Sequence, residues 1–118
     1  MNKKREIIDY INSTKDAHLN NSNVCFSKIN KSKLVWWLNV PVSKFVEDVN
    51  LLLKTENQVI WVLLPKGFAI GVPFKIREDI NTVDLEISAD KQFMYLQDLK
   101  SGGEEFNFKP FVKETINF

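Results

Sequence analysis

The stretch Val59–Leu64 places the strongest constraint on the fold, because every residue in it is apolar. Successive side chains of a strand point to opposite faces of the sheet, so a strand here would be apolar on both faces. Such a strand is stable only where other structure covers the sheet on both sides. The sequence therefore predicts that Val59–Leu64 is a central strand with packed layers above and below it.

The whole chain predicts an α+β fold with the order α-β-β-α-β-β-β-β. The fold would combine two helices with a mainly antiparallel, curved or partly rolled sheet of about six to seven strands. The expected helices are Lys3–Leu19 and Ser43–Lys54, and the other expected strands are Val24–Ile29, Lys33–Val40, Phe68–Ile76, Thr82–Ser88, Gln92–Gln97 and Glu105–Val112. Turn residues separate the later strands, which indicates a meander of antiparallel neighbours.

The segment Ser43–Lys54 has the clearest helical pattern in the chain. Its apolar residues recur at the i, i+4, i+7 and i+8 spacing of a helix face: Phe45, Val46, Val49, Leu52 and Leu53. Pro41 ends the preceding strand, and Ser43 is well placed to cap the helix. We therefore expect an amphipathic helix that packs on the sheet.

The segment Val24–Val40 predicts a hairpin whose second strand carries an informative alternation. A polar connection between its two strands suits a turn. Alternation places Trp36 in the core and Trp37 on the opposite face, together with Lys33 and Asn39. Trp37 is therefore either exposed to solvent beside a lysine or covered by a helix, and the sequence leaves both alternatives open.

The size and composition are those of one folded domain. The chain has 118 residues, of which 44% are hydrophobic and 26% charged, and we expect residues 1–118 to form a single domain. No apolar run approaches the length that crosses a bilayer. The basic amino terminus is interrupted by Glu6 and Asp9 and lacks the apolar core of a signal peptide. We expect a cytoplasmic protein that does not contact a membrane.

Residue counts argue against several kinds of catalytic and metal site. With one cysteine, Cys25, and one histidine, His18, the chain cannot form an internal disulfide or a Cys/His zinc site. His18 has no identifiable carboxylate to orient it, so a Ser-His-Asp or Cys-His mechanism has little support. The four glycines do not form a phosphate-binding loop pattern. We expect no cofactor, and this inventory suits a binding protein better than an enzyme.

Basic and aromatic residues interleave on the expected first hairpin. The candidate binding residues are Lys28, Lys31, Lys33, Trp37 and Asn39. Lysines attract phosphate without reading sequence, and a tryptophan ring stacks on a base or grips an apolar anchor. The net charge is only +1, with nine Lys/Arg against six Asp/Glu in residues 1–59. The first hypothesis is a small non-enzymatic binding module for nucleic acid or protein, with nucleic acid slightly favoured.

Acidic residues on two neighbouring expected strands supply a second hypothesis. Asp84 is followed by the triplet Asp98-Leu99-Lys100 at the end of the next strand. This pattern resembles the metal-binding core of the PD-(D/E)XK nucleases, with Val83 in place of the usual proline. The resemblance implies a metal-dependent hydrolase in which Asp84 and Asp98 hold a divalent cation and Lys100 helps to activate water.

A third hypothesis is a protein-interaction or oligomerising domain. An uncovered edge strand or a patch of exposed apolar side chains would then meet another chain, which includes a second copy of this one. The aromatic C-terminal stretch is one candidate for such a contact. Phe111 and Phe118 have no periodic place in a strand, so they either close the core or dock a partner.

Overall fold

The computed structural model describes residues 3–67, 74, 76–99 and 106–118. Within these ranges the chain forms one α-helix, seven strands and two 3-10 helices. In chain order they are α1 (Lys4–Thr14), β1 (Val24–Lys28), β2 (Val35–Pro41), η1 (Val42–Val46), β3 (Val49–Lys54), β4 (Gln58–Leu64), β5 (Ile76–Arg77), β6 (Thr82–Ser88), η2 (Lys109–Phe111) and β7 (Val112–Asn117). The α+β class is confirmed, with one α-helix fewer than the sequence predicts.

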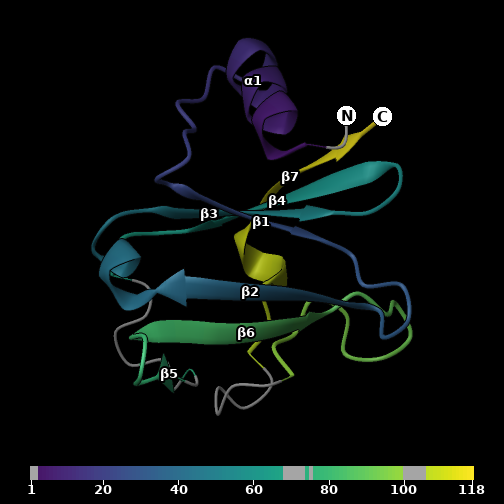
Figure 1. The fold of residues 1–118 in the computed structure, drawn as a ribbon. Coiled ribbons are helices and arrows are strands. Elements are labelled where there is room, and N and C mark those ends of the chain that lie inside the picture. Colours follow the sequence, from purple (N-terminus) through teal and green to yellow (C-terminus); the bar gives the residue numbers. More distant parts are fainter. Residues whose placement is uncertain (1–2, 68–73, 75, 100–105) are drawn as a thin grey trace.

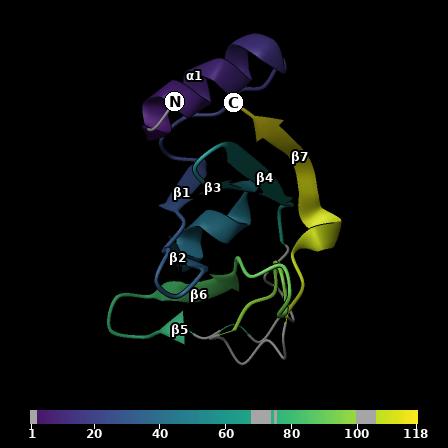
Figure 2. The ribbon, with the colours of Figure 1, turned by 90° about the vertical axis from the view of Figure 1, so that its right-hand side faces the viewer.

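The strands form two sheets. The four-stranded sheet has the order β1-β3-β4-β7, and the three-stranded sheet has the order β2-β6-β5. Among the described strands, β1 and β3 pair in parallel and all other pairs are antiparallel. In Figures 1 and 2, α1 lies against one side of the four-stranded sheet and the three-stranded sheet lies on the other. The predicted rolled sheet is therefore replaced by two separate sheets, neither of which closes into a barrel.

β4 is the central strand that its apolar sequence predicts. It lies between β3 and β7. One face packs into the larger core, which also receives the inner face of the three-stranded sheet, through Ile60, Val62 and Leu64. The other face packs into a second core under α1, through Val59 and Trp61. The expectation of packed layers on both sides of this strand is confirmed.

α1 covers the four-stranded sheet with three fully buried isoleucines, Ile7, Ile8 and Ile11. The helix ends before the predicted Leu19, because Asp16 adopts a left-handed φ of 53° that a helix does not continue through. The Asn12 side chain then fixes the returning chain, since it accepts from the Leu19 amide and donates to the Leu19 carbonyl, both at 2.8 Å. No helix in the described part of the chain is long and apolar enough to span a membrane.

The predicted second helix over Ser43–Lys54 is wrong. The chain forms the short helix η1 and then strand β3, which is buried along its whole length. Three successive leucines fit either a helical stripe or a strand that is covered on both faces. Tertiary pairing decides between them, because β3 lies between β1 and β4 and its backbone bonds to both. Leu51 and Leu53 then face the larger core, and Leu52 faces the core under α1.

The hairpin predicted for the first two strands is also wrong, although both strands are present. β1 pairs with β3, and β2 pairs with β6 in the other sheet. The Asn30 side chain accepts hydrogen bonds from the amides of Ser32 and Lys33, each at 3.1 Å, and Leu34 follows with a φ of 54°. These local bonds satisfy backbone donors without a hairpin ladder. The chain thereby leaves one sheet and enters the other.

The later strands are predicted with mixed success. Thr82–Ser88 is confirmed as β6. The predicted strand Gln92–Gln97 is wrong, because Met94 and Leu96 have φ values of 51° and 60°, which a strand does not allow. Most of the predicted strand Phe68–Ile76 lies outside the described residues, and its described end contributes to β5.

The C-terminal aromatic residues close the core, with one exception. The described part of the predicted strand Glu105–Val112 is irregular up to η2, and the terminal strand is β7 instead. Phe108 is fully buried, and Phe106 and Phe111 pack against the same core. Phe118 remains 44% exposed after the end of β7.

The alternation along β2 predicts different consequences for its adjacent tryptophans. Trp36 is 1% exposed and its indole Nε1 donates to the Lys54 carbonyl at 3.0 Å, whereas Trp37 is 45% exposed. We expect Trp36→Phe to lower the free energy of unfolding by about 2 kcal/mol, through lost packing and a lost buried hydrogen bond. Trp37→Phe should change it by less than about 0.5 kcal/mol. Urea denaturation followed by circular dichroism measures both, and equal losses would contradict the alternation.

Candidate functional site

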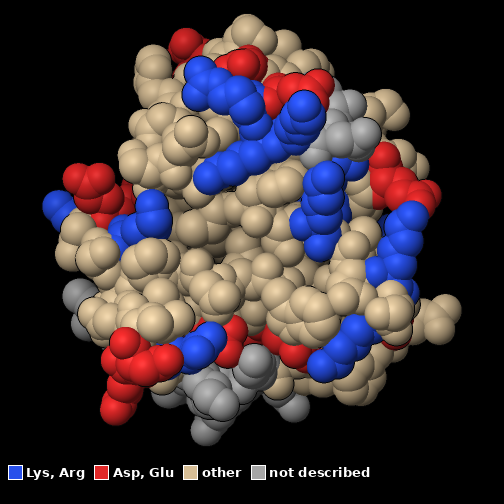
Figure 3. Space-filling view, viewed as in Figure 1, with Lys and Arg blue, Asp and Glu red and all other residues tan. Residues whose placement is uncertain are grey.

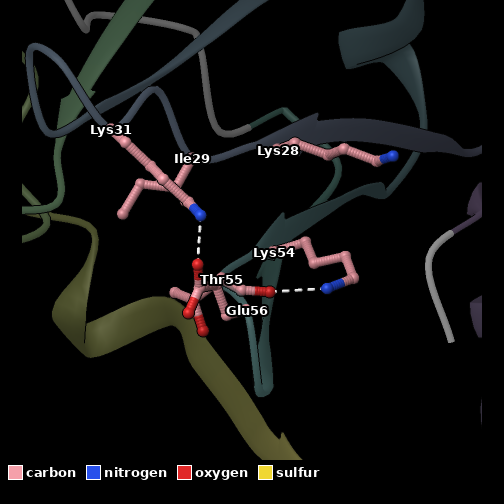
Figure 4. Close-up of a pocket in the computed structure, with 6 residues that line it drawn as sticks. All are labelled: Lys28, Ile29, Lys31, Lys54, Thr55 and Glu56. Atoms are coloured by element: carbon pink, nitrogen blue, oxygen red, sulfur yellow. Dashed lines mark hydrogen bonds and ion pairs between the residues drawn. The ribbon is translucent and has the colours of Figure 1, made fainter.

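The structure divides the predicted binding residues into two groups. Trp37 and Asn39 lie on the outer face of the three-stranded sheet, opposite Glu86 and Asp84 of β6, and Lys33 reaches this face from the turn before β2 through its ion pair with Glu86. We call these five residues the Trp37 face. Lys28 and Lys31 instead border a hollow of about 240 Å³. We call it the lysine hollow, and its lining residues are Lys28, Ile29, Lys31, Lys54, Thr55 and Glu56 (Figure 4).

Trp37 is held in place by Glu86, its register partner on β6. The Trp37 indole Nε1 donates to Glu86 Oε1 at 2.8 Å. Lys33 forms an ion pair with the same carboxylate at 3.3 Å, and its Nζ lies 5.6 Å from the centre of the Trp37 ring. The ring is therefore oriented by a hydrogen bond and a cation–π contact, while part of it remains open to solvent.

The Trp37 face is not basic. Asn39 is exposed and lies opposite Asp84 in the register of β2 and β6, and the ammonium of Lys33 forms an ion pair with Glu86. Because Glu86 neutralises Lys33, a phosphate gains little attraction here. The exposed ring and amide suit an aromatic or hydrogen-bonding group better than a phosphate.

The lysine hollow gathers ammonium groups from positions far apart in the sequence. Lys28 and Lys54 are register partners at the ends of the parallel strands β1 and β3. Lys31 follows β1 and forms an ion pair with Glu56. In Figure 4 the side chains of Lys28 and Lys54 extend toward the same side, whereas Lys31 turns toward Glu56. The parallel pairing therefore concentrates positive charge that spacing along the chain does not reveal.

Lys54 is the unusual member of the hollow, because it is only 4% exposed. Its Nζ donates to the Thr55 carbonyl at 2.6 Å and lies 5.6 Å from the centre of the Phe118 ring. No carboxylate of a described residue forms an ion pair with it. Fully buried lysines are rare unless an acid pairs with them. Sequence reasoning missed Lys54, since it placed this residue at the end of a surface helix.

Glu56 is the carboxylate among the residues that line the hollow. The hydrogen bond from Lys31 holds the pKa of Glu56 below its usual value, and the positive charges of Lys31 and Lys54 lower that pKa further. Glu56 is thus ionised at neutral pH. Three lysines face one carboxylate in the lining, so the hollow carries excess positive charge that suits an anion.

Two donors fix the backbone of Lys54. The Trp36 indole donates to its carbonyl oxygen at 3.0 Å, and the Ile29 amide donates to the same oxygen at 2.8 Å. Trp36 belongs to the three-stranded sheet, whereas Lys54 belongs to the four-stranded sheet. The position of Lys54 is therefore set by both sheets.

The remaining candidates do not converge on a metal site within the described residues. These residues contain no group of three or more His, Cys, Asp or Glu side chains that could hold a metal ion. His18 is exposed. Asp98 is 1% exposed and accepts a hydrogen bond from the Glu86 amide at 3.2 Å. Lys100 lies outside the described residues, so the nuclease-like arrangement with Asp84 stays a prediction.

Charge is dispersed over the face of the molecule shown in Figure 3. Lysine and arginine side chains surround a mainly uncharged central area, with acidic side chains among them. Some basic residues elsewhere in the described chain form ion pairs with acids, as Lys15 does with Glu114 at 2.8 Å. The hydrogen bond to Glu114 raises the pKa of Lys15, and the negative charge of Glu114 raises it further. The lysine hollow is a local concentration of charge, and this face carries no continuous basic field.

Cys25 should react slowly as a nucleophile in the folded chain. Burial raises the pKa of its thiol, and the nearby positive charges of Lys44 and Lys4 offset this only in part. We expect the native chain to react with an aromatic disulfide reagent at about pH 8 at least about tenfold more slowly than the urea-unfolded chain. The absorbance of the released thiolate measures both rates. Equal native and unfolded rates would show that the thiol is accessible and ionised.

Comparison with models of known protein families, with curated proteins and with solved structures finds no match to this chain.

Proposed function

We propose that the chain is a small non-enzymatic binding module whose ligand is a nucleic acid. The observation that carries this proposal is the course of the connection between β1 and β2. Lys28 ends β1, and Lys31 and Lys33 follow in the connection. The lysine hollow lies at the start of this path, and the exposed ring of Trp37 lies on β2 at its end. A basic track that leads to an exposed aromatic ring is the arrangement that proteins use for single-stranded nucleic acid.

The two groups of residues would divide the work of binding. Lys28 would attract the backbone phosphates, because the hollow has three lysines and one carboxylate in its lining and Lys31 is already paired with that carboxylate. Trp37 would stack on a base, since its ring is 45% exposed and oriented by Glu86. The neighbouring Asn39 is exposed and has an amide that can bond to a base edge.

The charge of the Trp37 face favours a single strand over a duplex. Stacking on Trp37 requires an unstacked base, which a duplex does not offer without distortion. The ion pair of Lys33 with Glu86 also leaves little positive charge on this face to hold a second phosphate backbone. The phosphates are therefore expected near Lys28, and a base near Trp37.

We expect fluorescence anisotropy with a labelled single-stranded oligonucleotide to show binding that weakens with salt. Trp37→Ala should weaken binding by about 1–3 kcal/mol without a change in the salt slope, because it removes stacking but no charge. Lys28→Ala should lower the magnitude of the salt slope by about 0.7, since one phosphate contact is lost.

Lys66→Ala is the matched control for Lys28→Ala. Lys66 is exposed and follows the end of β4 that lies away from the lysine hollow. Its removal should leave both the affinity and the salt slope nearly unchanged. An equal loss for Lys28→Ala and Lys66→Ala would indicate non-specific attraction by net charge. No binding to single-stranded DNA or RNA at low ionic strength would sink the proposal.

A protein contact is a second candidate function, favoured by the apolar residues of the three-stranded sheet. Five large apolar side chains on this sheet and its adjoining turns are between 41% and 59% exposed: Leu34, Trp37, Ile76, Ile80 and Phe93. Exposed apolar area of this kind marks protein-binding surfaces when the side chains are contiguous. A second copy of the chain is the simplest partner to test.

Under this second candidate, we expect the molar mass from size-exclusion chromatography with light scattering to rise with concentration toward that of a dimer. Phe93→Ser should shift the equilibrium back to the monomer, because it removes the most exposed of these five side chains, at 59%. Val46→Ser is the control, since Val46 is 69% exposed but lies on η1. A monomer at every accessible concentration would exclude self-association.

A further inference from the structure

We propose that the lysine hollow is a binding site for a single phosphate group, which the ammonium groups of Lys28 and Lys54 hold between them. The proposal goes beyond nucleic-acid binding, because a free phosphate or a phosphomonoester presents the same oxygen atoms as a backbone phosphate. Lys54, which the sequence does not single out, is the central residue of this site.

The burial of Lys54 is the first argument. The Lys54 residue is only 4% exposed, and the Thr55 carbonyl at 2.6 Å accepts from one of the three N–H donors of its ammonium. The Phe118 ring adds a cation–π contact but no formal negative charge. A buried charge without a counter-ion is costly. The Lys54 ammonium therefore retains two N–H donors and its positive charge for a ligand.

The position of Lys28 is the second argument. Lys28 and Lys54 are partners in the parallel register, and neighbouring strands lie about 4.8 Å apart. The Lys28 side chain forms no ion pair with a described residue, so two lysines without an ion-paired acid start from adjacent positions in the sheet. An oxyanion between them would accept two charge-assisted hydrogen bonds. In Figure 4 both side chains leave their strands toward the same side, and the Lys54 ammonium bends to the Thr55 carbonyl.

The size and border of the hollow are the third argument. Its volume of about 240 Å³ is below the range of about 300–1,000 Å³ that drug-sized ligands occupy, so a small anion suits it. The ion pair of Lys31 with Glu56 borders the site and neutralises itself. Lys28 and Lys54 are therefore the lysines of the lining that form no ion pair with a described residue.

The test titrates the full ¹⁵N-labelled chain with inorganic phosphate at fixed ionic strength, with chloride as the compensating anion. We expect saturable shifts of the backbone amides around Lys28 and Lys54, and a dissociation constant obtained from them. Lys54→Met keeps the buried stem and removes the charge, and Lys28→Met does the same at the exposed partner. Each should weaken phosphate binding about tenfold, the effect of one charge-assisted hydrogen bond. Lys66→Met should leave it unchanged.

Two results would overturn the inference. One is a phosphate affinity that survives unaltered in both Lys54→Met and Lys28→Met. The other is a set of non-saturating shifts spread over all lysines, Lys66 included, which would indicate general ion screening. If Lys54→Met does not fold, Lys54→Gln takes its place and should weaken phosphate binding in the same way. The location of the shifts in the unmodified chain is the second measurement, because shifts confined to the surroundings of Lys28 and Lys54 support the site.

Separate arms distinguish this site from the proposed nucleic-acid function. In one arm, inorganic phosphate is added to the complex with a labelled single-stranded oligonucleotide. Displacement of the oligonucleotide would show that its backbone phosphate occupies the same site as free phosphate. Trp37→Ala should retain phosphate binding while it weakens binding of the oligonucleotide. Phosphate binding at Lys54 without any oligonucleotide binding would refute the nucleic-acid function and leave this inference standing. If phosphate does not bind and Lys54→Met leaves oligonucleotide binding intact, this inference is refuted and the nucleic-acid function stands.

Discussion

The structure depends on two adjacent strands, β3 and β4, that are covered on both faces at once. One face of this pair belongs to the larger core, and the other belongs to the core under α1. Every polar group on these strands therefore needs a partner inside the protein. Asn50 has such partners, since its side chain accepts from the Trp61 indole at 2.9 Å and donates to the Asn23 carbonyl at 3.1 Å. Lys54 is the charged member of β3, and no carboxylate of a described residue forms an ion pair with it.

The parts of the fold that the sequence predicts are those decided by local periodicity. The apolar run of β4 requires cover on both sides, and the alternation along β2 separates Trp36 from Trp37. β3 failed as a prediction because its leucines fit a helical stripe equally well, and its true state follows from pairing with β1, more than twenty residues earlier in the chain. Likewise the left-handed backbone at Met94 and Leu96 does not follow from local sequence, since neither residue type favours it.

The sequence predicts the parts of the candidate site that depend on local periodicity, and it does not predict the parts that depend on pairing between distant strands. The exposure of Trp37 follows from alternation on a single strand, whereas its contact with Glu86 requires the pairing of β2 with β6. Lys28 was identifiable as a basic residue on a strand. Lys54 lies beside Lys28 only because its segment is a strand and pairs in parallel register with a distant strand. Charges concentrated by non-local pairing cannot be predicted from spacing along the chain.

Lys54 combines a rigid backbone with an unsatisfied charge. The Trp36 indole and the Ile29 amide both donate to its carbonyl oxygen, so its main chain is fixed by one donor from each side of the gap between the sheets. Its ammonium has a single neutral acceptor, the Thr55 carbonyl. Replacement of an unpaired buried charge by an apolar residue of similar shape is often neutral or stabilising. Lys54 is therefore difficult to explain by stability alone, and a side chain already ordered in the free protein binds a counter-ion with little further loss of conformational freedom.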